Sequence, residues 1–282
     1  MNSAIYSLVL ALAVGHAGAQ PKGSPDQLDL LPSKSPTPIF SATIRGKQYR
    51  FVLDTAPSAG MVSSRLVKAL SLRPMGDADA NDSSHNPNVK VRLYRLDGLQ
   101  AGHSIYNNIL VSADPSGQDS GPLSDVDGIL PLSTFGEREV TIDLPGRHLV
   151  IGADAHLKSK LAKSPTYDDN HGCPVLQMRL GGVRSAVRLD SGSEMGLSIP
   201  SSMLSKLHVI GTPKFVGKAR TMFRTFDINQ VKVSDEVRIG GVAFPNDGIL
   251  INDIFPEPNL GSRAMLSHRF TFDQRNHRIL IE

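Results

Sequence analysis

Two aspartates occur at equivalent places in a short motif that the chain contains twice. Each aspartate follows a leucine and precedes a hydroxyl residue and a small residue, in Leu-Asp-Thr-Ala at 53–56 and in Leu-Asp-Ser-Gly at 189–192. Two equivalent aspartates suggest two lobes that bring the carboxylates of Asp54 and Asp190 together. Paired carboxylates are a catalytic device, because one can accept a proton while the other donates one.

The similarity extends along a longer segment before each aspartate. The first copy, PIFSATIRGKQYRFVLDTAPS, runs from Pro38 to Ser58, and the second, PVLQMRLGGVRSAVRLDSGSE, runs from Pro174 to Glu194. In both copies a proline opens the segment and the aspartate follows at the same distance. Each copy has two strand-like runs separated by a turn-forming stretch, which predicts a β-hairpin before each aspartate.

The two halves also match beyond the aspartates. Segments with serines suited to N-capping and apolar residues three and four apart predict short helices at Ser63–Leu70 and Ser201–Leu207. Each half ends on two further strand-like runs, within Val140–Ile151 and within Phe270–Ile281. Four matches in the same order indicate a duplication.

Each residue of the two motifs has a distinct expected role. The leucines make both sites partly buried, and a buried carboxylate is costly unless it is paired or hydrogen-bonded. Thr55 and Ser191 supply hydroxyls that can hydrogen-bond across the lobe interface, and the small Ala56 and Gly192 let backbone N–H groups approach the carboxylates. If the lobes pack with pseudo-two-fold symmetry, Asp54 and Asp190 meet, share one proton and activate water for direct hydrolysis. This chemistry needs no metal, no cofactor and no covalent intermediate.

Length and composition set broad limits. The chain has 282 residues, 40% of them hydrophobic and 20% charged, which is ordinary globular composition with room for two domains. The net charge is +3 and no run of basic residues marks a nucleic-acid surface, so we expect no nucleic-acid partner. Cys173 is the only cysteine, which excludes an intrachain disulfide, and we interpret it as a structural residue.

The N-terminus has the pattern of a secretory signal. An apolar stretch at Tyr6–Val14 precedes Ala17-Gly18-Ala19, a cleavage-site pattern, and the stretch is too short to span a bilayer. The alternative is a buried N-terminal strand or helix. We expect a cleaved signal peptide, export to the periplasm or beyond, and no integral membrane segment after cleavage.

The chain resembles the pepsin-like and retropepsin-like aspartic peptidases, in a bacterial two-lobed form, from about Pro38 to Glu282. The two aspartate motifs resemble that family's D-[TS]-G signatures, Asp127–Leu132 (DGILPL) resembles its D-G-I-L-G-L segment, and FTFDQRNHRILI at 270–281 resembles its C-terminal strands. The resemblance implies that Asp54 and Asp190 form a catalytic dyad that hydrolyses a polypeptide substrate. It also implies a monomer with an internal pseudo-dimer.

The expected fold is therefore all-β and bilobal, acid-protease-like, with two pseudo-two-fold-related β-barrel lobes and one short helix in each. A polar stretch at Met75–Asn88 is expected to be a loop. The expected organisation is a signal peptide (1–19), a linker (20–37), an N-terminal lobe (38–152), an interlobe linker (153–172) and a C-terminal lobe (173–282).

The sequence departs from the family pattern at three positions. Ala56 stands where a glycine is usual, Pro131 replaces another usual glycine, and Glu194 adds a carboxylate close to Asp190. Ala56 motivates the alternative of a catalytically inactive, peptide-binding pseudopeptidase of the same fold. A further alternative, an unrelated β-rich exported protein, requires the repeated motif to be coincidental turn chemistry.

The family also closes a hairpin flap over its substrate, commonly with a tyrosine. We place the flap between the first helix and Asp127, near Asn81–Tyr94, with Tyr94 as the candidate tyrosine. None of the nine histidines lies in a metal-binding pattern, and Asp168–His171 lacks the spacing of a calcium loop.

Overall fold

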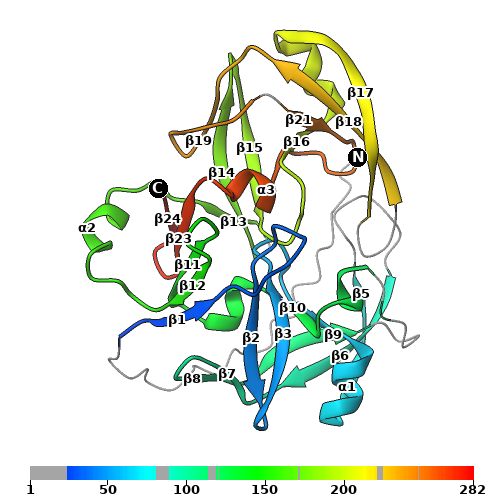
Figure 1. Cartoon of the computed structure of the whole chain (residues 1–282), viewed down its shortest axis with the longest axis vertical. Coiled ribbons are helices and arrows are strands. Elements are labelled where there is room, and N and C mark those ends of the chain that lie inside the picture. The colour runs from blue at the N-terminus through cyan, green and yellow to red at the C-terminus, as the bar shows by residue number, and fades with distance from the viewer. Residues whose placement is uncertain are drawn as a thin grey trace, which may run out of the picture.

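A computed structural model describes residues 24–80, 89–113, 119, 121–170, 172–220, 225–246 and 248–282. The predicted signal peptide at 1–19 lies outside these residues, so it stays a prediction. Most of the described chain is β-strand, and helices are few and short. The expected all-β, two-lobed fold is confirmed, and Figure 1 shows the two lobes at opposite ends of the long axis.

Each lobe is built on one large sheet. The sheet of the first lobe has nine strands, in the order β5 (Pro74–Ala80), β6 (Val89–Leu96), β9 (Ile109–Ala113), β4 (Gly60–Val62), β10 (Gly128–Leu130), β3 (Lys47–Leu53), β2 (Ile39–Ile44), β7 (Leu99–Ala101) and β8 (Ser104–Tyr106). The sheet of the second lobe has ten strands, with the main order β17 (Val209–Arg220), β18 (Thr225–Val233), β21 (Ile249–Ile251), β16 (Leu197–Ile199), β22 (Asn259–Gly261), β15 (Val183–Asp190), β14 (Cys173–Leu180), β19 (Val237–Ile239) and β20 (Val242–Phe244), and with β13 (Asp168–Asn170) paired to β14.

The two sheets have the same topology. When strands are matched in chain order, from β2 with β14 to β10 with β22, they occupy the same places in their sheets. The parallel pairs correspond as well: β3 pairs with β10 and β15 pairs with β22. The duplication that the sequence indicates is therefore present in strand order and direction, and not only in the aspartate motifs.

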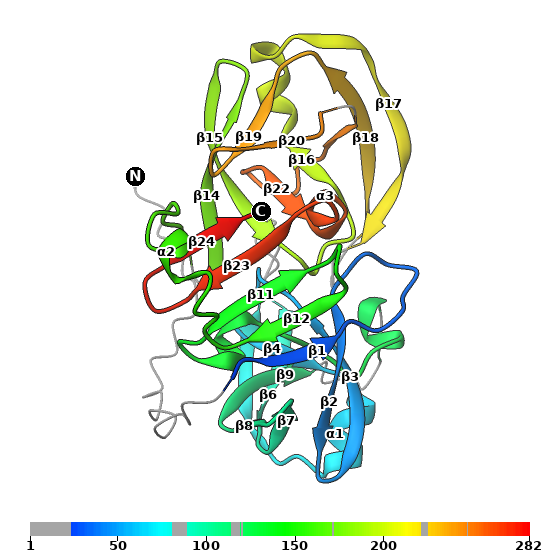
Figure 2. The ribbon, with the colours of Figure 1, turned by 60° about the vertical axis from the view of Figure 1, so that its left-hand side comes forward.

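A third sheet joins the lobes. It has five strands, in the order β1 (Asp26–Asp29), β12 (His148–Ile151), β11 (Glu139–Asp143), β23 (Arg269–Asp273) and β24 (Arg278–Ile281). Figure 2 shows this sheet between the two lobes. At its centre β11 and β23 are antiparallel, and Thr141 Oγ1 lies 2.9 Å from Thr271 Oγ1. This sheet contains strands from both halves of the chain. The lobe boundaries predicted at 152 and 173 stay predictions.

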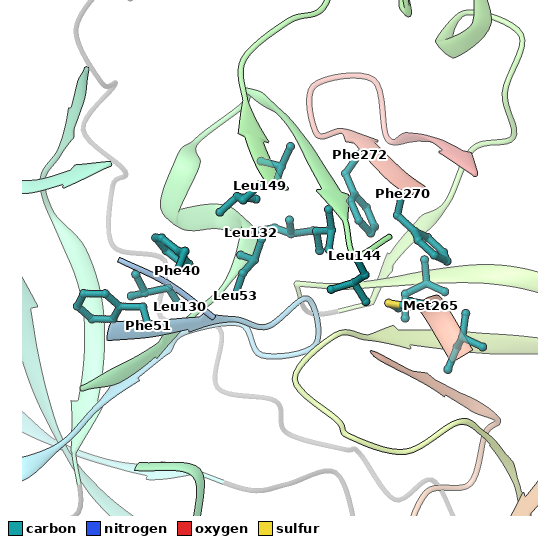
Figure 3. Close-up of a cluster of buried hydrophobic side chains, with 14 of the residues drawn as sticks. Phe40, Phe51, Leu53, Leu130, Leu132, Leu144, Leu149, Met265, Phe270 and Phe272 are labelled. Carbon is teal, nitrogen blue, oxygen red and sulfur yellow. The ribbon is translucent and has the colours of Figure 1, made fainter. Parts of the chain in front are cut away.

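The main hydrophobic core of the described residues extends through both lobes. Buried side chains from the large sheets of both lobes and from the five-stranded sheet form a single contiguous cluster. Figure 3 shows part of it, with labelled residues from the first half (Phe40, Phe51, Leu53, Leu130, Leu132, Leu144 and Leu149) and from the second half (Met265, Phe270 and Phe272). The lobes are therefore packed on each other and do not depend on a flexible tether.

The helices differ in part from the prediction. The first predicted helix is confirmed as α1 (Ser64–Leu70), which Ser63 caps by accepting a hydrogen bond from Leu66 N–H. Its counterpart, Ser201–Lys206, is a 3₁₀ helix that begins after Pro200 and lacks a side-chain cap. The other short helices are α2 (Lys158–Leu161), α3 (Ser262–Met265) and the 3₁₀ segments Gly121–Ser124 and Leu132–Phe135.

Three segments expected to be irregular contain strands. Within the predicted N-terminal linker, Asp26–Asp29 is β1 and pairs with β12. Within the predicted loop, Pro74–Ala80 is β5 and pairs with β6, while 81–88 lies outside the described residues. Within the predicted interlobe linker, Asp168–Asn170 is β13. Their polar residues gave little strand signal because most of them are exposed on edge strands, where backbone pairing decides the conformation.

A buried carboxylate anchors β1. Asp26 is 3% exposed, and its oxygens accept hydrogen bonds from His103 N–H (2.6 Å) and Ser104 Oγ (2.7 Å), with Arg138 Nη1 at 3.4 Å. Burial opposes ionisation, but these hydrogen bonds and the charge of Arg138 hold the pKa of Asp26 below its usual value. The N-terminal strand is thereby tied to both the first lobe and the five-stranded sheet.

We predict that Asp26→Ala lowers the free energy of unfolding by about 3 kcal/mol, because the largely buried Arg138 guanidinium loses its counter-ion and the His103 N–H and Ser104 hydroxyl lose their acceptor. Urea unfolding of the folded chain measures this. Asp29→Ala in the same strand is the matched control, since the Asp29 side chain is 87% exposed, and we expect a change within about 0.5 kcal/mol. Equal losses in the two variants would contradict the anchoring role.

Candidate active site

The loops that follow β3 and β15 interlock through their hydroxyl residues. Thr55 Oγ1 donates to the carbonyl of Leu189 (2.5 Å) and accepts from Ser191 N–H (3.0 Å). Reciprocally, Ser191 Oγ donates to the carbonyl of Leu53 (2.8 Å) and accepts from Thr55 N–H (3.1 Å). Both side chains are fully buried. The interaction across the interface that the sequence suggested for Thr55 and Ser191 is therefore present, and it is symmetric.

This interlock places the two aspartates next to each other. The carboxyl groups of Asp54 and Asp190 hydrogen-bond to one another. Each residue keeps part of its surface accessible to solvent. The structure thus brings together the two side chains that the sequence singled out, at the junction of the lobes.

Backbone N–H groups point at both carboxylates. Asp54 Oδ1 accepts from Ala56 N–H at 2.9 Å, and Gly192 N–H also donates to Asp54. Asp190 Oδ1 accepts from Ser193 N–H at 3.0 Å. These donors stabilise negative charge on the pair without adding another side chain. Ala56 and Gly192 are the small residues whose backbone N–H groups reach Asp54.

The two carboxyls cannot both ionise easily. Burial and then the negative charge of Asp190 raise the pKa of Asp54 to about 7. Burial likewise raises the pKa of Asp190, against the opposing effects of Arg188 and of a hydrogen bond from Asn259. A pair of this kind holds one shared proton across a wide pH range. In that form it can accept one proton and donate another in the same reaction.

Gly192 and Ala56 meet different constraints although they are equivalent in sequence. A Cβ at position 192 would lie 2.1 Å from Asp54 Oδ2, so only glycine fits there. Ala56 is not in the left-handed region that favours glycine, and its N–H makes the hydrogen bond to Asp54. The alanine in the first motif is therefore compatible with the geometry of the pair.

The other two departures from the family pattern are also accommodated. Pro131 begins the 3₁₀ helix Leu132–Phe135 with a φ of −77°, where its missing N–H has no helical partner to lose. Glu194 is exposed. Neither residue is among the hydrogen-bond partners that the structure gives to the two aspartates.

Two residues near the pair were missed by the sequence reasoning. Asn259 Nδ2 donates to Asp190 Oδ2 at 3.0 Å, and the guanidinium of Arg188 acts on both carboxyls through its charge. A comparison of the two halves position by position could have found them. The first half has Val52 and Ile129 at the equivalent places.

Cys173 is the residue outside the aspartate pair whose chemistry most needs checking, because a thiol can act as a nucleophile. Burial raises the pKa of the Cys173 thiol to about 11, so the nucleophilic thiolate is scarce at neutral pH. Within the described ranges, no group of three or more His, Cys, Asp or Glu side chains is arranged to hold a metal ion.

Each lobe carries a long hairpin at the end of its sheet. In the first lobe this is β5–β6, which falls between α1 and Asp127, where the flap was predicted; in the second it is β17–β18. The candidate flap tyrosine is not at the tip of its hairpin. Tyr94 is 8% exposed, belongs to the hydrophobic core and lies opposite Val111 of β9. Core packing therefore accounts for the tyrosine at this position.

A comparison with known protein families links the first half of the chain to proteins that use aspartates in catalysis. Residues 40–133 match the aspartyl protease family. The matched stretch contains Asp54, Thr55 and the Asp127–Leu132 segment, and it ends before the second lobe. The match supports an aspartic protease family for this chain and a protease-type, hydrolytic function. No curated protein matches the sequence.

We predict that Thr55→Val lowers the free energy of unfolding by roughly 2–4 kcal/mol, because the buried Leu189 carbonyl and Ser191 N–H both lose their partner. Urea unfolding measures the change. Thr212→Val, at an exposed position of β17, serves as the control and should change stability by less than about 0.5 kcal/mol. A Thr55→Val variant as stable as the control would show that the interlock contributes little.

A second prediction compares the equivalent small residues. Gly192→Ala should lower the free energy of unfolding by about 1–3 kcal/mol, because the new methyl overlaps the Asp54 carboxyl. Ala56→Gly should cost at most about 1 kcal/mol, through the added freedom of the unfolded chain. Both are measured by the same unfolding experiment. The reverse order of the two losses would contradict the assignment of Gly192 as the glycine that the pair requires.

Proposed function

We propose that this protein is an exported aspartic endopeptidase that cleaves polypeptides with water activated by the Asp54/Asp190 dyad. The observation that carries the proposal is the pair of carboxyls, held side by side by reciprocal hydrogen bonds at the lobe junction and raised in pKa by burial and mutual charge. This is the arrangement that acid–base hydrolysis of a peptide bond needs.

The reaction follows from the shared proton. The ionised carboxylate takes a proton from a water molecule as the water oxygen bonds to the peptide carbonyl carbon, and the protonated carboxyl gives its proton to the carbonyl oxygen. A hydrated, tetrahedral carbon results, and the two carboxyls have exchanged roles. The newly protonated carboxyl then gives its proton to the amide nitrogen, while the ionised carboxylate takes a proton from one hydroxyl of the tetrahedral carbon. The carbonyl re-forms, the carbon–nitrogen bond breaks with its electron pair on nitrogen, and a new carboxyl terminus and a new amino terminus result.

The substrate is proposed to be an extended polypeptide. The hairpins β5–β6 and β17–β18 continue the two large sheets, and an extended chain can bind to such strands through its main-chain hydrogen bonds. A monomer suffices for the reaction, because each lobe of this one chain contributes one aspartate.

Export is proposed from the sequence of residues 1–19, with its apolar stretch and cleavage-site pattern. No helix within the described residues is long and apolar enough to cross a membrane. The inactive alternative rested on Ala56, and Ala56 keeps its hydrogen bond to Asp54. No observation favours that alternative.

We predict a bell-shaped dependence of peptidase activity on pH. Activity should appear as the first carboxyl ionises and should fall as pH rises through about 7, where Asp54 loses the proton that it donates. Asp54→Asn and Asp190→Asn should each lower kcat by about 10²–10⁴-fold with little change in stability. Cleavage of an unfolded protein by the mature chain, from about pH 3 to about pH 8, measures both effects.

Glu194→Gln is the matched control, since this nearby carboxylate is exposed, and we expect wild-type activity. An analogue with a tetrahedral hydroxyl-bearing carbon in place of the scissile carbonyl should inhibit. The absence of cleavage across the whole pH range, or full activity in either aspartate variant, would contradict the proposed mechanism.

A further inference from the structure

Two residues before each aspartate, on the strand that leads to it, the two lobes carry chemically different residues. The residue on the parallel neighbouring strand differs as well. In the first lobe Val52 of β3 lies opposite Ile129 of β10, and in the second lobe Arg188 of β15 lies opposite Asn259 of β22. Both pairs belong to parallel strands that lead directly to the motifs. The backbone is therefore duplicated, while an apolar pair on one side is replaced by a cation and an amide on the other.

The apolar pair has a simple structural role. Val52 is 5% exposed and belongs to a small hydrophobic cluster with Leu123 and Val126, against which Ile129 packs. Nothing in this cluster can donate a hydrogen bond from a side chain to Asp54. The polar pair of the second lobe cannot be explained by the same need for packing.

The side chain of Asn259 makes a hydrogen bond to Asp190. The Asn259 side chain is fully buried, and Nδ2 donates to Asp190 Oδ2 at 3.0 Å. Its Oδ1 has no hydrogen-bond partner within the part of the chain that the structure describes. Rotating the amide by half a turn would aim Oδ1, an acceptor, at the carboxylate, so the donor orientation fits an ionised Asp190. A buried amide with one unpaired oxygen is unfavourable unless the other end makes a strong bond.

Arg188 adds a positive charge to the same side. Its guanidinium lies over the ring of Phe255, 5.1 Å from the ring centre, and its backbone N–H donates to the carbonyl of Pro258. Of the influences that favour the ionised form of Asp190, Arg188 is the largest and Asn259 comes second. For Asp54, the hydrogen bonds from backbone N–H groups favour the ionised form more strongly than Arg188 does, and the effect of Arg188 is the smallest of these influences.

We propose that Arg188 and Asn259 are positioning residues that leave Asp190 ionised and place the shared proton of the dyad on Asp54. This rests on the proposed peptidase function and goes beyond it, since it assigns the two roles. Asp190 then takes the proton from water, and Asp54 gives its proton to the substrate carbonyl oxygen. The electron pair of the water oxygen forms the new bond to carbon while the carbonyl π pair moves to oxygen.

Other titratable groups face this region. The Cys173 thiol, on β14, hydrogen-bonds to Arg188, and Glu257, before β22, interacts with Arg188 through its charge. Burial raises the pKa of the thiol to about 11, so Cys173 stays neutral where the dyad titrates. Glu257 acts on Arg188 and is not among the influences on either aspartate.

The first experiment is the pH profile of kcat/KM for single variants of the full mature chain. Asn259→Leu removes the donor to Asp190, so the acid limb should move up by roughly one to two pH units while the basic limb stays in place. Arg188→Met should move both limbs up, because the lost charge favoured ionisation of both carboxyls. Arg188→Lys should restore most of the wild-type profile, and Ile129→Leu, the matched change in the first lobe, should leave it unchanged.

The second experiment does not depend on activity. The chain is labelled with ¹³C at the aspartate carboxyl carbons, and the Asp54 and Asp190 signals are assigned with Asp54→Asn and Asp190→Asn. In the wild-type protein the Asp190 carboxyl should ionise first, and the Asp54 carboxyl should ionise at about pH 7. This titration needs no variant of Arg188 or Asn259 to fold.

The outcomes separate the inference from the proposed function. If Asp54 ionises first, or if folded Asn259→Leu and Arg188→Met titrate like the wild type, the assignment is overturned even when the enzyme cleaves peptides. If Asp190 ionises first and no peptide is cleaved, the assignment of the proton stands and the proposed function fails. Circular dichroism confirms that each variant is folded before its profile is compared.

Discussion

The structure depends on keeping two carboxyl groups side by side in a place where water only partly solvates them. Such a pair is unfavourable by itself, since burial penalises each charge and each charge penalises the other. The raised pKa of both Asp54 and Asp190 expresses that cost. The fold offsets it with fixed hydrogen-bond donors and a rigid interlock. Thr55 and Ser191 make the interlock without presenting a further charge, because each hydroxyl bonds to the backbone of the opposite loop.

The duplicated topology makes this interlock geometrically simple. Each aspartate lies at the end of a central strand, Asp54 directly after β3 and Asp190 as the last residue of β15, and each strand has a parallel neighbour on one side and an antiparallel one on the other. Central strands with two paired neighbours are held on both edges, so their ends are well fixed. The five-stranded sheet then sets the distance between the lobes, with Thr141 and Thr271 paired at its centre. The positions of the two carboxyl groups are therefore set mainly by paired backbone.

Much of the fold could be predicted because it is repeated. The hairpins before each aspartate, the helix capped by Ser63 and the terminal strands of each half all follow from local patterns that occur twice. What the sequence did not predict lacks such a pattern. β1 and β5 are polar and take their conformation from their pairing partners, and Tyr94 resembled a flap residue although it packs in the core. Side-chain burial of this kind depends on neighbours that are distant in sequence.

The geometry of the candidate site could be predicted where the two halves are alike and could not be predicted where they differ. Searching for similarity between the halves found Asp54 and Asp190, but it passed over Arg188 and Asn259, because they replace Val52 and Ile129 and so reduce the similarity. A pair of carboxyls related by strict symmetry has no preferred place for its single proton. A peptide substrate, however, is directional and presents different atoms to the two carboxyls. A single chain with two unequal lobes can assign the base and the acid before the substrate arrives, whereas two identical subunits must let the substrate decide. The polar pair under Asp190 is the kind of difference that duplication within one chain permits.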